Sequence, residues 1–157
     1  MAFFSTFPGN AILTFLVSLV PVVELRGAIP LGVAHDLPLL ASMAISVVGN
    51  LIPVPFIIIF VRKIFRWLET KSEWLRRVVA YFENKAEGKK DTVLKYEFWG
   101  LMVLVAIPLP GTGAWTGSLV AAMLDMQLKR AIPSIFAGVV VAGIIVTLAT
   151  CGVIAIA

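Results

Sequence analysis

Charged residues are scarce in this chain, and long stretches of it lack them altogether. Only 14% of its 157 residues are Asp, Glu, Lys or Arg, whereas about 25% is usual in a soluble domain. Four runs contain no charged residue: 1–23, 37–61, 98–124 and 131–157. Uncharged apolar runs longer than about 18 residues are typical of bilayer-embedded segments. The chain is therefore predicted to be an integral membrane protein, because a soluble fold would have too little polar surface to cover four such runs.

Cysteine and histidine are nearly missing as well, with one residue of each. The single Cys151 excludes an internal disulfide and a Cys-rich metal site. The single His35 excludes a multi-histidine centre, and together with Asp36 it is expected to lie in a short solvated loop. No nucleophile–base pair and no metal-ligand set is visible in the sequence. We therefore expect no enzyme activity, no cofactor and no metal site.

Positive charge is concentrated in the middle of the chain. Ten of the 13 Lys and Arg residues lie between residues 62 and 95, and by the positive-inside rule this segment faces the cytoplasm. Its apolar residues fall on one helical stripe, which predicts an amphipathic helix on the membrane surface: Ile64, Leu68, Leu75, Val78 and Phe82. The basic charge therefore indicates orientation and contact with anionic lipids, not nucleic-acid binding.

Two segments of the chain are similar in the order of their features. Residues 20–34 read VPVVELRGAIPLGVA and residues 107–121 read IPLPGTGAWTGSLVA. Each follows a short apolar run, and each precedes an acidic residue and a long uncharged run. The matching positions are Pro21 and Pro108, Gly27 and Ala114, Pro30 and Gly117, Ala34 and Ala121, Asp36 and Asp125, and Ser46 and Ser134. These features predict that the chain is built from two repeats.

Each repeat is predicted to begin with a re-entrant hairpin. The apolar segments before the two breaks, 10–20 and 98–107, would form helices about 16 Å long, which is about half of a ~30 Å hydrocarbon core. Proline removes a helical hydrogen bond and clashes with the preceding turn. The chain is therefore expected to turn back at each break, and only 37–61 and 131–157 would cross the bilayer completely.

The predicted fold class is an all-α integral membrane protein with two inverted repeats, 8–61 and 96–157, in a single membrane domain. Each repeat would be a re-entrant helical hairpin plus one full transmembrane helix, and a cytoplasmic amphipathic helix in 62–95 would join them. The alternative is four ordinary crossings with kinks. The positive-inside rule favours the hairpins, because four crossings would place Lys129 and Arg130 outside. The hairpin arrangement places both termini outside, whereas four crossings place both inside.

Glu24 and Arg26 are the candidate functional charges, because they lie deep in the first hairpin. Each would cost roughly 2.5–3.5 kcal/mol at a bilayer centre unless it faces a cavity or a partner. Residues two apart do not face each other on a regular helix. They are therefore expected to pair in a non-helical tip, or each to reach the opposite hairpin. They would serve either as a structural clamp or in handling substrate or protons.

The two hairpin tips are predicted to form an anion-binding cradle. The second helix of each hairpin would begin near Gly27 and near Ala114, and helix N-termini favour anions. Arg26 would add a full positive charge suited to phosphate or carboxylate. Alternatively, Glu24 would bind a proton and an organic cation alternately, and Trp115 would stack on the cation. The remaining candidate residues are Pro30, Asn50, Pro108, Pro110, Gly111, Thr112, Gly113 and Thr116. Among them, Asn50 would either form a hydrogen bond between two helices or line a cavity.

Two motifs resemble a known family over essentially the whole chain. They are Pro-x-x-Glu-Leu-Arg-Gly-Ala-x-Pro from Pro21 to Pro30 and Pro-x-Pro-Gly-Thr-Gly-Ala-Trp from Pro108 to Trp115. They resemble the small multidrug export proteins of bacteria and archaea, which implies a prokaryotic cytoplasmic membrane.

The hairpin layout is also similar to the DedA superfamily, whose members have two opposed re-entrant hairpins and include proteins of proton-linked lipid-phosphate recycling. Glu24 matches the acidic residue of their first hairpin. Their second hairpin carries arginine where this chain has Gly111-Thr112-Gly113, so Arg26 would have to supply that charge.

These observations predict a small DedA-like transporter, proton-coupled, that moves an anionic lipid or a phosphate-bearing substrate. Glu24 would be the coupling or gating acid, and Arg26 with the helix N-termini would hold the anionic group. Export of small cationic compounds is one alternative, and an uncoupled scramblase-like or structural membrane protein is another. Two hairpins and two crossings offer little lateral packing, so a homodimer surrounded by membrane lipids is expected.

Overall fold

The computed structural model describes the chain except residues 1–6, 72, 74–75, 78–89, 110–111 and 157, and the described part is helical without a strand. The helices are α1 (Phe7–Leu19), α2 (Glu24–Ala34), α3 (Leu39–Leu51), α4 (Pro53–Lys71), α6 (Lys90–Ala106), α7 (Ala114–Met123) and α8 (Leu128–Ile156). The predicted all-α class is confirmed. Part of the predicted amphipathic segment, 72, 74–75 and 78–89, lies outside the described residues, and its start, from Arg62, belongs to α4 without a break.

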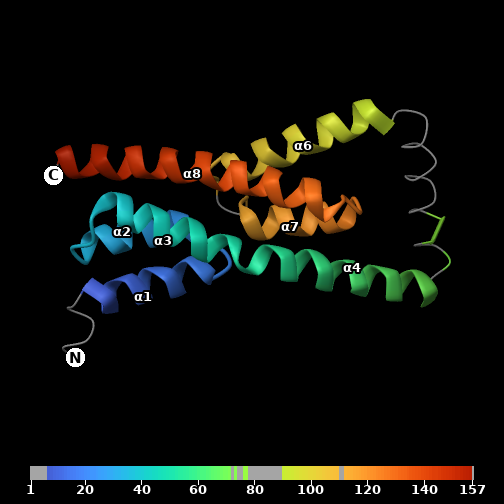
Figure 1. Ribbon diagram of the computed structural model, residues 1–157, viewed down its shortest axis with the longest axis horizontal. Helices are drawn as coiled ribbons and strands as arrows, with labels where there is room; N and C mark the ends of the chain where they lie inside the picture. Colours follow the sequence, from blue (N-terminus) through green and yellow to red (C-terminus); the bar gives the residue numbers. More distant parts are fainter. Residues whose placement is uncertain (1–6, 72, 74–75, 78–89, 110–111, 157) are drawn as a thin grey trace.

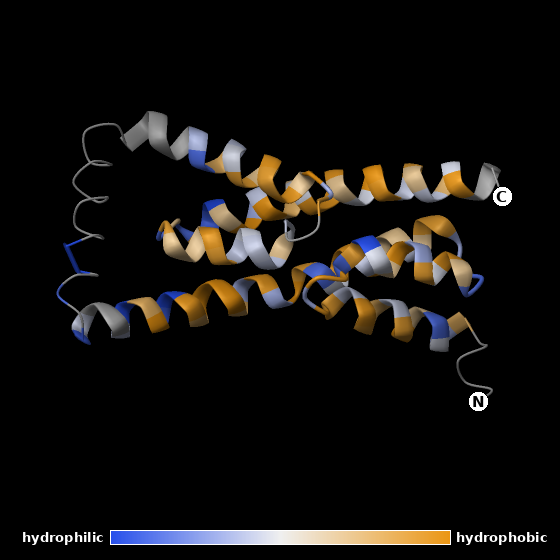
Figure 2. Ribbon diagram, turned by 180° about the vertical axis from the view of Figure 1, so that it is seen from behind, coloured by the Kyte–Doolittle hydropathy of each residue, from blue (hydrophilic) through white to orange (hydrophobic). Residues whose placement is uncertain are grey.

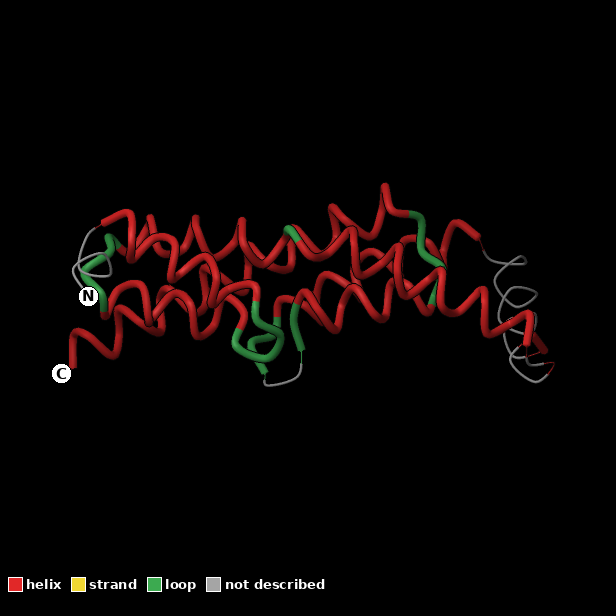
Figure 3. Tube along the Cα trace, turned by 90° about the horizontal axis from the view of Figure 1, so that it is seen from below, coloured by secondary structure: helices red, strands yellow, loops and turns green. Residues whose placement is uncertain are grey.

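Two helical hairpins lie end to end along the molecule (Figure 1). Helices α1 and α2 form the first hairpin and pack on α3, while α6 and α7 form the second and pack on α8 and α4. The two breaks lie near the middle, and Figure 3 shows the loop between α6 and α7 at this level. The start of α1 and the end of α8 lie at one end of the molecule, called here the terminus end. The end of α4 lies at the opposite, basic end.

Two helical spans are long and apolar enough to cross a membrane, Leu39–Trp67 and Leu128–Val153. The first combines α3 and α4, which are separated at Ile52 because Pro53 and Pro55 have no N–H to donate. Helices α1 and α7 and the apolar part of α6 are shorter. The first span continues past the predicted crossing 37–61 into the basic segment, whereas the second begins slightly before the predicted crossing 131–157 and also ends before it.

The helices expose apolar side chains along their length, as a lipid-facing protein does. Phe56 of α4 is 70% exposed and Leu148 of α8 is 67% exposed. Figure 2 shows hydrophobic residues along most of α4 and α8 and hydrophilic residues gathered toward the basic end of α4. A soluble protein rarely exposes contiguous apolar surface on this scale. The surface is therefore consistent with the predicted membrane protein.

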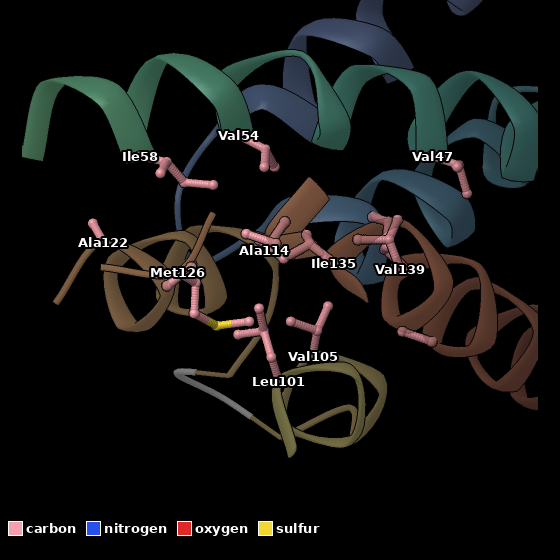
Figure 4. Packing of buried hydrophobic residues seen from close by; sticks show 14 of the residues in the cluster. Val47, Val54, Ile58, Leu101, Val105, Ala114, Ala122, Met126, Ile135 and Val139 are labelled. Carbon is pink, nitrogen blue, oxygen red and sulfur yellow. The ribbon is translucent and has the colours of Figure 1, made fainter. Parts of the chain in front are cut away.

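The core lies where the second hairpin meets α4 and α8 (Figure 4). Six of its side chains are fully or almost fully buried and come from three helices, α4, α6 and α8: Val54, Ile58, Leu101, Val105, Ile135 and Val139. Gly117 and Gly138 lie against Val105, where an added methyl group would collide with that side chain. Small residues at helix contacts allow the backbones to approach closely in membranes. The apolar cluster thus fixes the second hairpin to the two long helices.

The second helix of each hairpin ends in the same turn. Asp36 and Asp125 both adopt a left-handed conformation, with φ values of 62° and 46°. Their N–H groups donate to the carbonyls three residues earlier, and the N–H groups of Leu37 and Met126 donate to the carbonyls five residues earlier. This is the Schellman pattern of helix termination, in which the residue after the left-handed position packs inward. Both of these apolar residues are buried, so the two acidic residues that matched in the sequence share a structural role.

The left-handed conformation at Asp36 predicts which substitutions this turn tolerates. Asp36→Val should lower the stability of the protein by about 1–2 kcal/mol, because a β-branched side chain is strained there. Asp36→Gly should be at least as stable as the wild type, because glycine adopts this conformation freely. Thermal unfolding of the two variants in detergent measures the difference. Equal melting temperatures would show that the turn does not depend on the left-handed residue.

Candidate functional site

Glu24 of the first hairpin binds the N-terminus of α7 in the second hairpin. Its side chain is 4% exposed, and the carboxylate accepts a hydrogen bond of 3.2 Å from the backbone N–H of Trp115. The N–H of Ala114 also contacts it. The first N–H groups of a helix lack partners within the helix and carry partial positive charge. The carboxylate therefore serves as a capping anion for α7, delivered from a different part of the chain.

Gly113 leaves the space that this carboxylate occupies. Its φ of 146° belongs to a region that side chains rarely adopt, and a methyl group there would lie 2.6 Å from the Glu24 carboxyl carbon. Glu24 itself has a φ of 48°, and the β-branched Val22 has a φ of 82°. Such conformations cost about 1–3 kcal/mol each and persist only where the surroundings impose them. The strained turn thus aims Glu24 at the opposite hairpin.

Arg26 binds the break between α6 and α7. Its guanidinium donates to the carbonyl of Leu109, to the carbonyl of Ile107 at 3.1 Å and to the hydroxyl of Thr112 at 3.0 Å. Carbonyl groups at a helix C-terminus carry partial negative charge, so a cation is favourable just beyond α6. The first hairpin therefore places a negative group at the start of α7 and a positive group at the end of α6.

Glu24 and Arg26 each reach the opposite hairpin, which was one of the two arrangements left open by their spacing. None of the ion pairs among the described residues joins them. Asn50 of α3 is fully buried, and its amide lies beside the Glu24 carboxylate. The amide N–H group is therefore positioned to donate to that carboxylate. The three side chains form one polar group between the two hairpin tips.

The other predicted site residues surround this group. Gly27 and Pro30 lie in α2, Pro30 inside the helix rather than at its end. Trp115 and Thr116 lie in the first turn of α7, and Trp115 meets Glu24 through its backbone. Pro110 and Gly111 lie outside the described residues. Helix α7 begins at Ala114 as expected, but α2 begins at Glu24 rather than near Gly27, because the chain re-enters a helix directly after the strained turn.

A cavity of about 800 Å³ lies between α2, the second half of α8 and the second break. Arg26 is the one charged residue of its lining, which is otherwise almost entirely apolar: Pro30, Val33, Ala34, Pro108, Ile145, Val146, Ala149, Thr150 and Val153. The α8 residues of this wall were missed, because a uniform apolar helix gives no signal of which face lines a cavity. The cavity can hold an apolar body with an anionic group next to Arg26.

A half-buried ion pair near the basic end was also missed. Arg62 of α4 contacts Asp125 with 2.9 Å between Nε and Oδ1, and its guanidinium donates to the carbonyl of Met126. It therefore secures the turn between α7 and α8. Arg62, at the end of an apolar run, indicated the membrane orientation in the sequence. Its partner Asp125 lies 63 residues later and could be identified only from the fold.

Comparison with curated proteins and with solved structures finds no match to this chain. The family described as putative small multi-drug export protein matches residues 24–145. The matched region begins at Glu24 and contains α2 to α7, most of α8 and both charged site residues. Membership supports a small membrane transporter and a membrane location. The chain therefore belongs to the putative small multi-drug export protein family.

Proposed function

We propose that this small membrane transporter moves an anionic amphiphile, such as a lipid phosphate, by a proton-coupled mechanism of the DedA type. The observation that carries the proposal is the cavity beside Arg26, because it combines an apolar lining with a single positive charge. Ligand sites are commonly apolar with a few placed polar groups that fix orientation. An amphiphile would place its apolar body against α2 and α8 and its anionic group near Arg26.

The charge of Arg26 favours an anion over a cation in this cavity. Its guanidinium is held by two carbonyls and a hydroxyl, which are neutral groups and leave its full charge in place. A charge among apolar walls attracts a counter-ion more strongly than it would in water, because little solvent screens it. Guanidinium groups are also suited to phosphate and carboxylate. A cationic drug would be repelled from the same position.

Glu24 is proposed to couple protons to the movement of the substrate. Its carboxylate occupies the N-terminus of α7, which is a ready anion site. Protonation would remove the negative charge and weaken this contact between the hairpins. The substrate anion could then replace the carboxylate at the α7 N-terminus, and deprotonation would expel it. The Glu24 carboxylate and the substrate anion would thus compete for the α7 N-terminus, and protonation of Glu24 would favour the anion.

The hairpins are proposed to be re-entrant and related as inverted repeats. Each breaks near the middle of the molecule, and the hairpins approach that level from opposite ends (Figure 1). Broken helices that meet near the midplane are typical of transporter repeats. Irregular backbone at that depth is tolerated where it is buried or lines a cavity, and Arg26 satisfies the carbonyls of the second break.

This arrangement predicts that the terminus end faces away from the cytoplasm. A C-terminal alkaline phosphatase, which is active only outside the cytoplasm, should be active, and a C-terminal green fluorescent protein should be dark. The same reporters inserted between residues 62 and 95 are the control and should give the opposite pattern. A fluorescent C-terminal fusion would favour four ordinary crossings and remove the basis for the inverted repeats.

Native mass spectrometry of the purified protein tests the proposed substrate class. The wild type should carry a bound polyprenyl phosphate or another anionic lipid, and Arg26→Ala should lose it. Arg62→Ala is the matched control, because it removes a half-buried arginine that bonds backbone and carboxylate at the basic end. It should keep the lipid. No anionic lipid in the wild type, or equal amounts in wild type and Arg26→Ala, would contradict the proposal.

Export of cationic compounds remains the second candidate, because the family description names multi-drug export. It would use Glu24 as the cation-binding acid and the half-buried Trp115 beside it as a stacking surface. Transport assays with matched anionic and cationic amphiphiles separate the two candidates by substrate charge. An uncoupled scramblase-like protein would move lipid at the same rate with and without a proton gradient.

A further inference from the structure

A column of small polar side chains runs between α1 and α3 inside the first hairpin bundle. Three lie four residues apart on α1 and three lie four residues apart on α3, so each set shares one helix face. All six are at most 6% exposed. The polar column consists of Asn10, Thr14 and Ser18 on α1 and Ser42, Ser46 and Asn50 on α3.

Contacts with three backbone positions connect the column from end to end. Asn10 donates a hydrogen bond of 2.5 Å to the carbonyl of His35, in the turn at the terminus end. A methyl group on Gly32 would meet both Thr14 and Ser42, so these side chains flank one point of α2. A methyl group on Gly49 would meet the hydroxyl of Ser18, next to Asn50. The column therefore extends from the terminus end to the amide beside Glu24.

Several of these buried polar groups have unused hydrogen-bonding capacity. Thr14 and Ser18 donate to the carbonyls of Asn10 and Phe15 in their own helix, and the Asn50 amide faces the Glu24 carboxylate. The hydroxyls of Ser42 and Ser46 and the amide oxygen of Asn10 lack partners among the described residues. A buried polar group without a partner costs roughly 1–3 kcal/mol, so close packing alone does not explain a line of them. Hydroxyls that both donate and accept hydrogen bonds are the groups that a proton relay requires.

The second hairpin has no such column on the basic side of Glu24. Within the described residues, the contact of α6 with α8 is formed by apolar side chains such as Leu101, Val105 and Ile135 (Figure 4). Its two buried hydroxyls are satisfied, since Ser118 donates to the carbonyl of Ala114 and Ser134 to that of Phe98, each at 2.6 Å. Among the described residues, a line of buried polar side chains therefore leads to Glu24 from the terminus side and not from the basic side.

We infer that the polar column is the pathway by which protons pass between the terminus end and Glu24 while the two hairpins are in contact, and that exchange with the basic side requires the hairpins to separate. Each of the four hydroxyls, with water between those that do not touch, would pass on one proton as it receives another, while the two amides orient the line without carrying protons. Hydronium at the terminus end thus loses one proton, and one O–H bond forms on the Glu24 carboxylate. Arg26 is the charged group that acts on Glu24, while α3 and α7 face it with an amide and backbone N–H groups. The inference rests on the proposed role of Glu24 as the coupling acid.

Sided labelling of Glu24 tests this pathway without any transported substrate. Dicyclohexylcarbodiimide modifies protonated carboxyl groups in apolar surroundings. It is added to right-side-out and inside-out vesicles whose two faces are held at different pH, and labelling is read on the Glu24 peptide by mass spectrometry. Lowering the pH by one unit on the terminus side should raise labelling by up to about tenfold. The same change on the basic side should have little effect.

Two double variants test whether the response of labelling to pH on the terminus side depends on the polar column. Ser42→Val together with Ser46→Val should abolish the response to pH on the terminus side. Ser118→Ala together with Ser134→Ala removes two buried hydroxyls outside the column and should leave the response unchanged. The wild-type result tests the inference even if the valine variant does not fold.

Three results would overturn the pathway: labelling that follows the basic side or both sides equally, no labelling at any pH, and an unchanged sided response in the folded valine variant. Sided labelling without transport of anionic lipid would reject the proposed function and keep the pathway. Coupled transport with labelling controlled from the basic side would reject the pathway alone.

Discussion

Gly113→Ala is expected to abolish coupled transport and to destabilise the protein. The added methyl group would lie 2.6 Å from the Glu24 carboxyl carbon, so the carboxylate could not stay at the N-terminus of α7. Loss of a helix cap costs about 0.5–2 kcal/mol, and a side chain at a φ of 146° adds about 1–3 kcal/mol of strain. A melting curve in detergent measures the loss of stability, and gradient-driven transport in proteoliposomes measures the loss of coupled transport.

Gly100→Ala is the matched control for this substitution. Gly100 lies in α6, and a methyl group there meets nothing within 4 Å. Alanine is the better helix former by about 1 kcal/mol, so this variant should be as stable as the wild type or more stable, with normal transport. If both variants behaved alike, the close approach of Gly113 to Glu24 would have no importance for stability or transport.

The sequence predicted the elements of this fold because their signals are local. Uncharged runs identified the two long spans, and prolines and glycines marked the two breaks. The start of α7 at Ala114 followed from the glycines before it. These features depend on residues within one or two turns of each other. Asp36 and Asp125 matched in the sequence because each directly follows a short apolar helix. The structure explains the match, since both residues occupy the same helix-terminating turn.

The partners of the charged residues could not be predicted in this way. Glu24 and Arg26 are two residues apart, but their hydrogen-bond partners lie more than 80 residues later. Whether the two side chains pair with each other or reach the opposite hairpin depends on how the strained turn at Val22 rotates them. A β-branched valine gives no sign of a positive φ in the sequence. The polar column was missed for a related reason. Single Ser, Thr and Asn residues in apolar helices are common, and their alignment becomes visible only when α1 and α3 are paired.

Glu24→Gln is expected to preserve the fold and lipid binding while removing the response to a proton gradient. Glutamine resembles the protonated glutamate in shape and charge, and its oxygen can still accept a hydrogen bond from the Trp115 N–H, so the hairpins should stay in the weakened contact expected for protonated Glu24. The glutamine side chain cannot release a proton, so the exchange between carboxylate and substrate anion stops. In proteoliposomes, movement of an anionic lipid should fall to the level of empty vesicles when only a pH gradient drives it. Native mass spectrometry should still detect the lipid bound near Arg26.

Two further glutamate variants locate the effect at this carboxyl group. Glu24→Asp keeps a titratable acid but shortens its reach to α7, so it should retain a weakened response to the gradient. Glu97→Gln removes a different glutamate, in α6, and should transport normally. A Glu24→Gln protein that followed the gradient like the wild type would show that Glu24 is a structural cap for α7. Because Arg26 and the cavity would be unchanged in that case, the result would place proton coupling at another group and leave the proposed anionic substrate in place.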